Sequence, residues 1–244
     1  MSPPQDQKKF TRTMTDPKPT EYRQTGFTRP NGATELWLVR HGESRAATAD
    51  NPFPLVDGHG DPELHPNGRA QAERVADLLE DVPIDALYVT TLRRTGETAA
   101  PLCQRRGYQP AVEPDLREVL LGDWEGGVLR IKAHEQDPVF LAVQAQQRWD
   151  LIPGAESNER LTARTTAAIE RIVARHPDQR VVAFVHGGII ANVLANAAGS
   201  RPFSFMGAEN GSLSRLVIHE GRTRVLSFNE VGHLAGLSAS SAMT

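Results

Sequence analysis

The stretch Leu36-Trp37-Leu38-Val39-Arg40-His41-Gly42-Glu43-Ser44 joins a short apolar run directly to a polar cluster. Such a run predicts a buried β-strand that ends at the polar residues. Two further runs have the same design: residues 86–89 lead into Thr90-Thr91-Leu92-Arg93-Arg94, and residues 181–185 lead into His186-Gly187-Gly188. Ligand crevices of open α/β sheets lie beyond the carboxyl ends of strands, so we expect two histidines and one or two arginines to converge there.

Helical patterns separate these strands. The predicted helices span residues 66–80, 92–106, 132–148, 158–175 and 189–197. Residues 212–218 and 223–227 are predicted to form a β-hairpin turned by Glu220-Gly221. Apolar strands that alternate with amphipathic helices predict an α/β fold, a three-layer sandwich with a mainly parallel sheet flanked by helices on both faces.

The domain organisation follows from composition. Residues 34–234 are predicted to form a single domain with a small helical cap at about 127–157. Residues 1–33 contain six basic and three acidic side chains, five prolines and few aliphatic residues, which is typical of a disordered extension. Residues 235–244 are predicted to be a frayed tail.

Composition excludes several classes of protein. The 244 residues have a formal net charge of −3, which argues against a general nucleic-acid binder or a polybasic membrane protein. No apolar run is long enough to span a bilayer and no secretory signal is visible, so the expected compartment is the cytoplasm. The single cysteine, Cys103, permits neither an internal disulfide nor a cysteine-based zinc site.

The residue types at the three strand ends favour an anion site over a metal centre, because no carboxylate follows these strands. Arginine matches phosphate oxygens with a planar, permanently charged fork. A histidine in such a pocket can attack phosphorus with one ring nitrogen if a backbone hydrogen bond fixes the other. Glu118 is the best candidate for the proton donor, and the nearby Glu125 is the alternative.

The motifs resemble those of the histidine phosphatase superfamily, which includes the phosphoglycerate mutases and broad-specificity phosphatases. The similarity begins with Leu38-Val39-Arg40-His41-Gly42-Glu43-Ser44 and extends in the family's order to about Phe228. The other matching motifs are Gly68-Arg69-Ala70-Gln71-Ala72, Thr90-x-Leu92-x-Arg94-x-x-x-Thr98-Ala99, Leu116-x-Glu118 with Gly122-x-Trp124-Glu125-Gly126, Pro153-Gly154-Ala155-Glu156-Ser157 and Val185-His186-Gly187-Gly188.

The resemblance implies a role for each matching residue. His41 would become the phosphohistidine, and Glu118 would be the proton donor and later the base that activates water. The residues implied to bind the phosphoryl group are Arg40, Ser44, Arg94, His186 and Gly187. Arg93 is the alternative to Arg94. The resemblance implies no cofactor and no metal ion, and the mixed spacing of His59 and His65 with nearby aspartates does not predict a metal site.

One position departs from the family pattern. Many members have Asn three residues after the Ser or Thr of the first motif, as a further phosphate contact, whereas this chain has Ala47. The segment 45–60 is also longer and more irregular than usual. Ser44, and Arg45 or His59 with it, would have to replace the missing contact.

The predicted function is a metal-independent phosphatase, a phosphoric monoester hydrolase acting on small-molecule phosphomonoesters. Only 68 positions separate Glu118 from His186, which resembles the compact phosphatase branch. The alternatives are a phosphoglycerate mutase that depends on 2,3-bisphosphoglycerate and a scaffold member with weak chemistry. The sequence leaves the physiological substrate and the oligomeric state open, a homodimer included.

Overall fold

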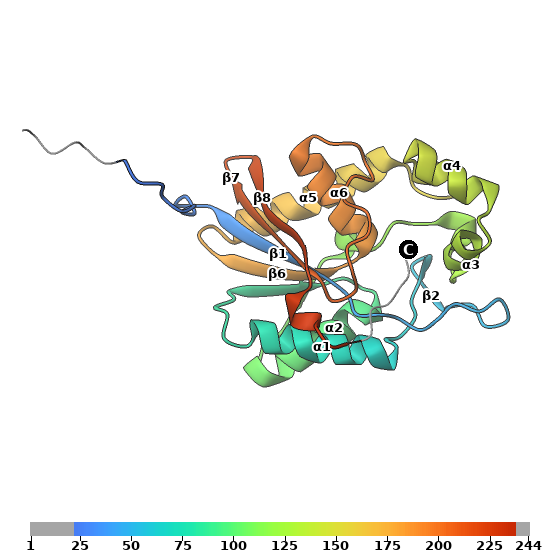
Figure 1. Cartoon of the computed structure of the whole chain (residues 1–244), viewed down its shortest axis with the longest axis horizontal. Coiled ribbons are helices and arrows are strands. Elements are labelled where there is room, and N and C mark those ends of the chain that lie inside the picture. The colour runs from blue at the N-terminus through green and yellow to red at the C-terminus, as the bar shows by residue number, and fades with distance from the viewer. Residues whose placement is uncertain (1–21, 238–244) are drawn as a thin grey trace, which may run out of the picture.

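The computed structural model describes residues 22–237, and its centre is a six-stranded mixed sheet with the order β5-β4-β6-β1-β7-β8 (Figure 1). The strands are β1 (Thr34–Arg40), β4 (Ala86–Val89), β5 (Ala111–Val112), β6 (Arg180–Val185), β7 (Leu213–His219) and β8 (Arg222–Glu230). The first four are mutually parallel, and the β7–β8 hairpin adds two antiparallel strands beside β1. The predicted hairpin is confirmed.

Alternation along β1 divides the core between two faces of the sheet. Leu36 and Leu38 are fully buried in the cluster that also contains Ile172 and Ile189 of the helices on one face. Trp37 and Val39 belong to the cluster on the other face. Successive side chains of a strand point to opposite faces, so an apolar strand such as β1 needs helices on both sides.

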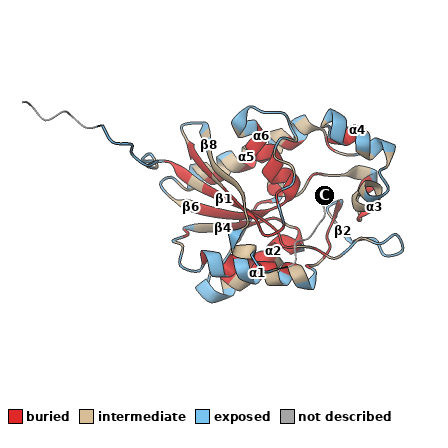
Figure 2. Cartoon of the chain, viewed as in Figure 1, coloured by how far each residue is buried: buried red, intermediate tan, exposed pale blue. Residues whose placement is uncertain are grey.

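Two pairs of helices cover the two faces of the sheet (Figures 1 and 2). One face carries α1 (Pro66–Leu79) and α2 (Arg93–Arg106), and the other carries α5 (Asn158–Arg175) and α6 (Gly187–Ala198). The predicted helix starts and ends agree with these bounds to within two residues. Local chemistry explains the ends: the His65 side chain accepts from the Asn67 N–H to cap α1, and Gly107 ends α2 in the left-handed conformation.

The predicted helix at 132–148 is wrong. The cap consists of two helices, α3 (Val128–His134) and α4 (Pro138–Gln146), followed by a short 3₁₀ turn at Trp149–Leu151. Gln136 has a positive φ of 54°, Asp137 caps α4 through the Val139 N–H, and Pro138 begins the new helix. Proline has no N–H for an intrahelical bond, so it favours a first helical position over an interior one.

The irregular segments contain short strands that the sequence did not indicate. These are the edge strand β5 and the two-residue strands β2 (Leu55–Val56) and β3 (His59–Gly60), which pair with each other next to the cap. Residues 1–21 of the predicted tail and 238–244 of the predicted C-terminal tail lie outside the described residues. Within the described part of the N-terminal segment, Arg29 donates to the Asp178 backbone oxygen at 2.9 Å.

Candidate active site

The end of β1 is fixed by glycine-to-glycine packing. A Cβ on Gly42 would lie 2.4 Å from the Gly68 backbone oxygen, and a Cβ on Gly68 would lie 2.0 Å from the Glu43 oxygen. Gln71 accepts from the Glu43 N–H at 2.8 Å. The two glycines and Gln71 therefore seat the turn after β1 directly on the first turns of α1, which holds His41 at a defined position.

His41 presents one unprotonated ring nitrogen to the pocket. Its Nδ1 lies 2.7 Å from the Gly42 backbone oxygen, which can only accept a hydrogen, so Nδ1 carries the proton. Its Nε2 accepts from Arg94 Nε at 3.2 Å. Burial, together with the positive charges of Arg94 and Arg40, holds the pKa of His41 well below its usual value. The imidazole is therefore neutral, and its Nε2 lone pair faces the Arg94 guanidinium.

Arg94 reaches the pocket and Arg93 does not. The buried Arg94 guanidinium also donates to the Gly60 oxygen at 2.9 Å and lies 3.9 Å from Asp61. Arg93 points away and pairs with Glu97 at 2.8 Å on the exposed surface of α2. Thr98, one turn after Arg94, donates to the Arg94 oxygen at 2.7 Å and accepts from the Gly42 N–H, which ties α2 to the end of β1.

His186 and Arg40 complete the buried group. The His186 ring lies edge-on to His41 with centroids 5.2 Å apart, and its Nε2 is 3.0 Å from Thr90 Oγ1. His186 Nδ1 and Arg40 Nε have no hydrogen-bond partner among the residues that the structure describes. A Cβ on Gly187 would lie 3.3 Å from Arg40 Nε, so this glycine leaves the guanidinium accessible from the helix start.

Two glutamates line the same pocket in different surroundings. Glu118 Oε2 accepts from the Gly188 N–H at a long 3.3 Å, and Oε1 accepts from the N–H of Val119. Both oxygens of Glu125 accept short backbone bonds, 2.7 Å from Gly60 and 2.8 Å from Leu121. Burial raises the pKa of Glu125. Glu125 thus joins two loops, whereas the carboxylate of Glu118 lies at the start of α6, against Gly188.

Ser44 does not offer its hydroxyl to the histidines in this arrangement. It is buried, and its Oγ accepts from Arg130 Nη2 at 2.7 Å. Arg45 pairs with Glu63 at 3.4 Å, whereas His59 lines the pocket. Of the predicted substitutes for the missing Asn at position 47, His59 therefore shares the pocket with His41 and Arg45 is directed to an ion pair.

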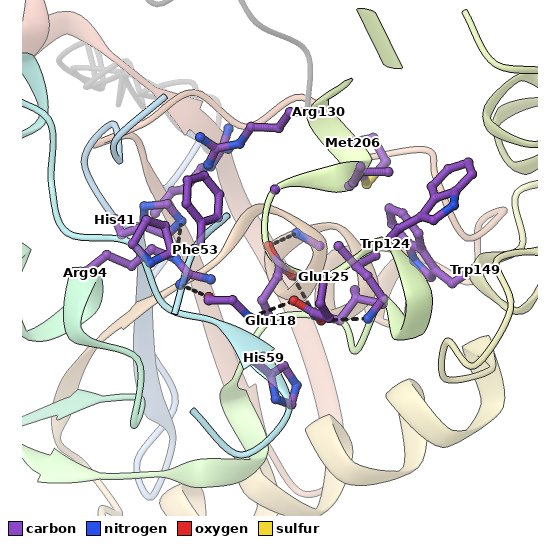
Figure 3. A pocket seen from close by; sticks show the side chains of 18 residues that line it. His41, Phe53, His59, Arg94, Glu118, Trp124, Glu125, Arg130, Trp149 and Met206 are labelled. Carbon is purple, nitrogen blue, oxygen red and sulfur yellow. Dashed lines mark hydrogen bonds between the residues drawn. The ribbon is translucent and has the colours of Figure 1, made fainter. Parts of the chain in front are cut away.

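Arg130 lines the pocket and was not predicted. The predicted helix began at residue 132, which left Arg130 in an irregular segment with no pattern to orient it. In the structure it lies on α3, and Figure 3 shows its guanidinium directed toward Phe53 and His41. The only signal in the sequence was a lone arginine three residues after Gly127.

The remaining wall of the pocket is apolar. Trp124, Leu129, Trp149 and Met206 line the side opposite His41, as Figure 3 shows for Trp124, Trp149 and Met206. A ligand that places an anionic group among the guanidiniums would rest its other end against these side chains.

Two absences within residues 22–237 bear on other kinds of function. No three His, Cys, Asp or Glu side chains in that range are grouped in a way that could hold a metal ion. In the same range, no helix combines the length and the apolar character that crossing a bilayer requires.

Known proteins resemble this chain in sequence and in fold. Phosphoglycerate mutase-like protein 4 of Arabidopsis thaliana is 35% identical over 169 residues, which cover 68% of this chain and 72% of that protein. The metal-independent phosphoserine phosphatase of the same plant is 28% identical over 213 residues, or 84% of each chain. The native structure of a mycobacterial glucosyl-3-phosphoglycerate phosphatase gives a TM-score of 0.68 at 28% identity and covers 81% of this chain and 99% of that one.

A family model described as the histidine phosphatase superfamily (branch 1) matches residues 36–231, which include all three strand ends and both glutamates. The sheet, the flanking helices and the motif order agree with this match. The chain belongs to the histidine phosphatase superfamily.

Proposed function

We propose that this protein is a metal-independent phosphatase that hydrolyses small-molecule phosphomonoesters through a phosphohistidine at His41. The observation that carries the proposal is the fixed tautomer of His41, with Nδ1 on the Gly42 oxygen at 2.7 Å and Nε2 facing Arg94 at 3.2 Å. A neutral imidazole whose unprotonated Nε2 lies among the groups that would bind a dianion is suited to nucleophilic attack on phosphorus.

The first half of the reaction forms a P–N bond and breaks a P–O bond. His41 Nε2 attacks phosphorus in line with the ester oxygen, while Arg40, Arg94 and His186 stabilise the charge on the three phosphoryl oxygens. The protonated carboxyl of Glu118 donates its proton to the departing alcohol oxygen. The products of this half are the alcohol, phosphohistidine and the Glu118 carboxylate.

The second half returns the enzyme to its starting state. The Glu118 carboxylate removes a proton from water, the resulting oxygen attacks phosphorus, and the P–N bond breaks with its electron pair returning to His41 Nε2. Inorganic phosphate leaves, and Glu118 is protonated again. Fixed cationic side chains supply the charge stabilisation that a metal ion provides in other phosphoryl-transfer sites.

The relatives and the pocket support this choice. One relative is named a metal-independent phosphoserine phosphatase, and a structural neighbour is a glucosyl-3-phosphoglycerate phosphatase. The apolar wall of Trp124, Leu129, Trp149 and Met206 is suited to an alcohol portion that is not highly charged.

The test is a trapped intermediate together with loss of activity. With p-nitrophenyl phosphate we expect steady phosphate release that EDTA does not lower, and an acid-labile, alkali-stable phosphoenzyme after a rapid quench. His41→Asn should abolish both signals. Hydrolysis at the original rate by this variant would disprove the nucleophile.

A parallel assay separates hydrolysis from the mutase alternative. We expect phosphate release from phosphorylated metabolites to exceed the isomerisation of 3-phosphoglycerate in the presence of 2,3-bisphosphoglycerate. Isomerisation well above phosphate release would establish the mutase instead. Absence of both activities and of the phosphoenzyme would indicate the scaffold alternative.

A further inference from the structure

Arg130 is a cation in the pocket without an acidic partner. It lies on α3 of the cap and lines the pocket together with Arg40, His41 and Arg94. Among residues 22–237 no carboxylate lies within ion-pair distance of Arg130, whereas Arg94 in the same pocket lies 3.9 Å from Asp61. A partly buried guanidinium without a counter-ion is costly, which points to an anionic ligand.

The contacts of Arg130 hold it in place and leave donors free. Nη2 donates to Ser44 Oγ at 2.7 Å, and Nη1 donates to the Arg45 backbone oxygen at 2.9 Å. The guanidinium carbon lies 5.2 Å from the centre of the Phe53 ring, and that of Arg45 lies 4.9 Å from the same ring. A guanidinium has five N–H donors, so these two hydrogen bonds leave three for a ligand.

Arg130 lines the same pocket as Arg40 and Arg94, and these charges indicate which anion it faces. Burial, and after it the positive charges of Arg94 and Arg40, lower the pKa of Arg130 to about 10, against a smaller opposing effect of Glu43, which lies beyond ion-pair distance. Its strongest electrostatic neighbours are therefore the two arginines of the phosphoryl site. Three guanidinium groups that line one pocket repel one another, and a dianion bound between them would offset this repulsion.

We propose that Arg130 is a third guanidinium ligand of the transferring phosphoryl group, supplied by the cap. The proposal rests on the proposed phosphatase function and adds a residue to it. It also implies that the phosphoryl site is complete only when α3 packs over the loop that contains Ser44 and Phe53. Arg130 would thus supply charge in the region where Ala47 offers none.

The experiment measures the binding of inorganic phosphate. This measurement does not depend on turnover, and the ligand carries no second anionic group. Calorimetric titration compares the original protein with Arg130→Met, Arg130→Lys and Lys132→Met. Lys132 is the matched control because it lies on the same helix but pairs with Asp137 at 3.1 Å outside the pocket. Circular dichroism and thermal unfolding verify that each variant is folded, and Arg130→Lys retains the charge if the methionine variant does not fold.

The expected result follows from the loss of charge-assisted hydrogen bonds. Arg130→Met should weaken phosphate binding about 10- to 100-fold, and Arg130→Lys should lie between this variant and the original protein. Lys132→Met should bind within about twofold of the original, since exposed ion pairs contribute little. Equal phosphate affinity in Arg130→Met and Lys132→Met would overturn the proposal.

A second readout separates the phosphoryl group from another anion on the substrate. If Arg130 binds the phosphoryl group, Arg130→Met should lower kcat/KM by a similar factor for p-nitrophenyl phosphate and for phosphoserine. A loss confined to phosphoserine would place Arg130 at a carboxylate and overturn the proposal. If the original protein and Lys132→Met neither bind phosphate nor hydrolyse either ester, the proposed function itself fails.

Discussion

Arg164 donates a hydrogen bond from Nη2 to the backbone oxygen of Glu118 at 2.9 Å. The same guanidinium donates from Nη1 to the backbone oxygens of Asp115 and Arg117 at 2.7 and 2.8 Å. Glu156 holds it in place through an ion pair of 2.6 Å and also accepts from the Leu120 N–H. One side chain of α5 therefore fixes the backbone of the loop that carries the proposed acid.

Replacing Arg164 should reduce catalysis without removing any group that touches the substrate. In Arg164→Met the loop oxygens lose their donor and Glu156 loses its counter-ion, so Glu118 is no longer held at the start of α6. We expect kcat to fall about 10- to 100-fold, since several hydrogen bonds to a charged group are lost together. Phosphate affinity should change much less. Arg160→Met, an exposed position on the same helix, is the control; an unchanged kcat in Arg164→Met would disprove the positioning role.

Gly188 is the residue that admits the Glu118 carboxylate. A Cβ at this position would lie 2.5 Å from Glu118 Oε1 and 2.7 Å from Val119 Cγ2. Gly188→Ala should therefore displace Glu118 and lower kcat at least tenfold, measured on p-nitrophenyl phosphate. Gly96→Ala is the matched control in a helix, because a Cβ there meets no atom within 4 Å. The control should stabilise the protein by about 0.5–1 kcal/mol in urea unfolding.

The dependence of the rate on the leaving group identifies the general acid. Glu118→Gln should slow alkyl phosphates, whose alcohols are poor leaving groups, far more than aryl phosphates, because a stable phenolate needs little protonation. Glu125→Gln should lower activity on both classes by a similar factor, since Glu125 accepts backbone bonds from Gly60 and Leu121. Rates are measured over a series of esters with different leaving-group pKa values. If the leaving-group dependence follows Glu125 instead, the acid assignment moves to that residue.

The lowered pKa of His41 predicts how stability depends on pH. In the folded protein, burial and the nearby arginines keep its pKa well below 6.5, whereas the unfolded chain takes up the proton near 6.5. Below that pH the unfolded state binds more protons, so the free energy of unfolding falls as the pH falls. His41→Asn should make this decline shallower by up to about 1.4 kcal/mol per pH unit. Urea unfolding between about pH 6.5 and 5 measures it, and parallel curves for the two proteins would contradict the shift.

The strand ends were predictable because three apolar runs are followed at once by their polar residues. His41, Arg94 and His186 therefore meet as the sequence indicated, and the choice of Arg94 over Arg93 agrees with the direction in which each side chain points. The roles of Gly68 and Gln71 are visible only in the structure, where each residue contacts the turn after β1.

The cap was predicted less well. A continuous apolar pattern masked the break before Pro138, and the true start of α3 placed Arg130 in the pocket. Its partners, Ser44 and Arg45, lie 86 and 85 positions away in the chain. No local periodicity reports a contact over such a separation, so neither Arg130 nor the role of Arg164 beside Glu118 could be found from the sequence.

The position of β1 in the centre of the sheet has a consequence for synthesis of the chain. β1 is made early, but its neighbours are β6, where Glu35 pairs with Arg180, and β7, where Leu36 pairs with Leu216. Asn210, which donates to the His41 oxygen at 2.9 Å, is 169 positions downstream. A ribosome-bound chain that ends just before residue 210 contains β6 but not β7, so its first strand lacks one of its two neighbours. Long-range pairing of this kind forms slowly. Phosphoryl-transfer activity should arise only as the final hairpin joins the sheet, so an incomplete translation product leaves phosphate esters intact.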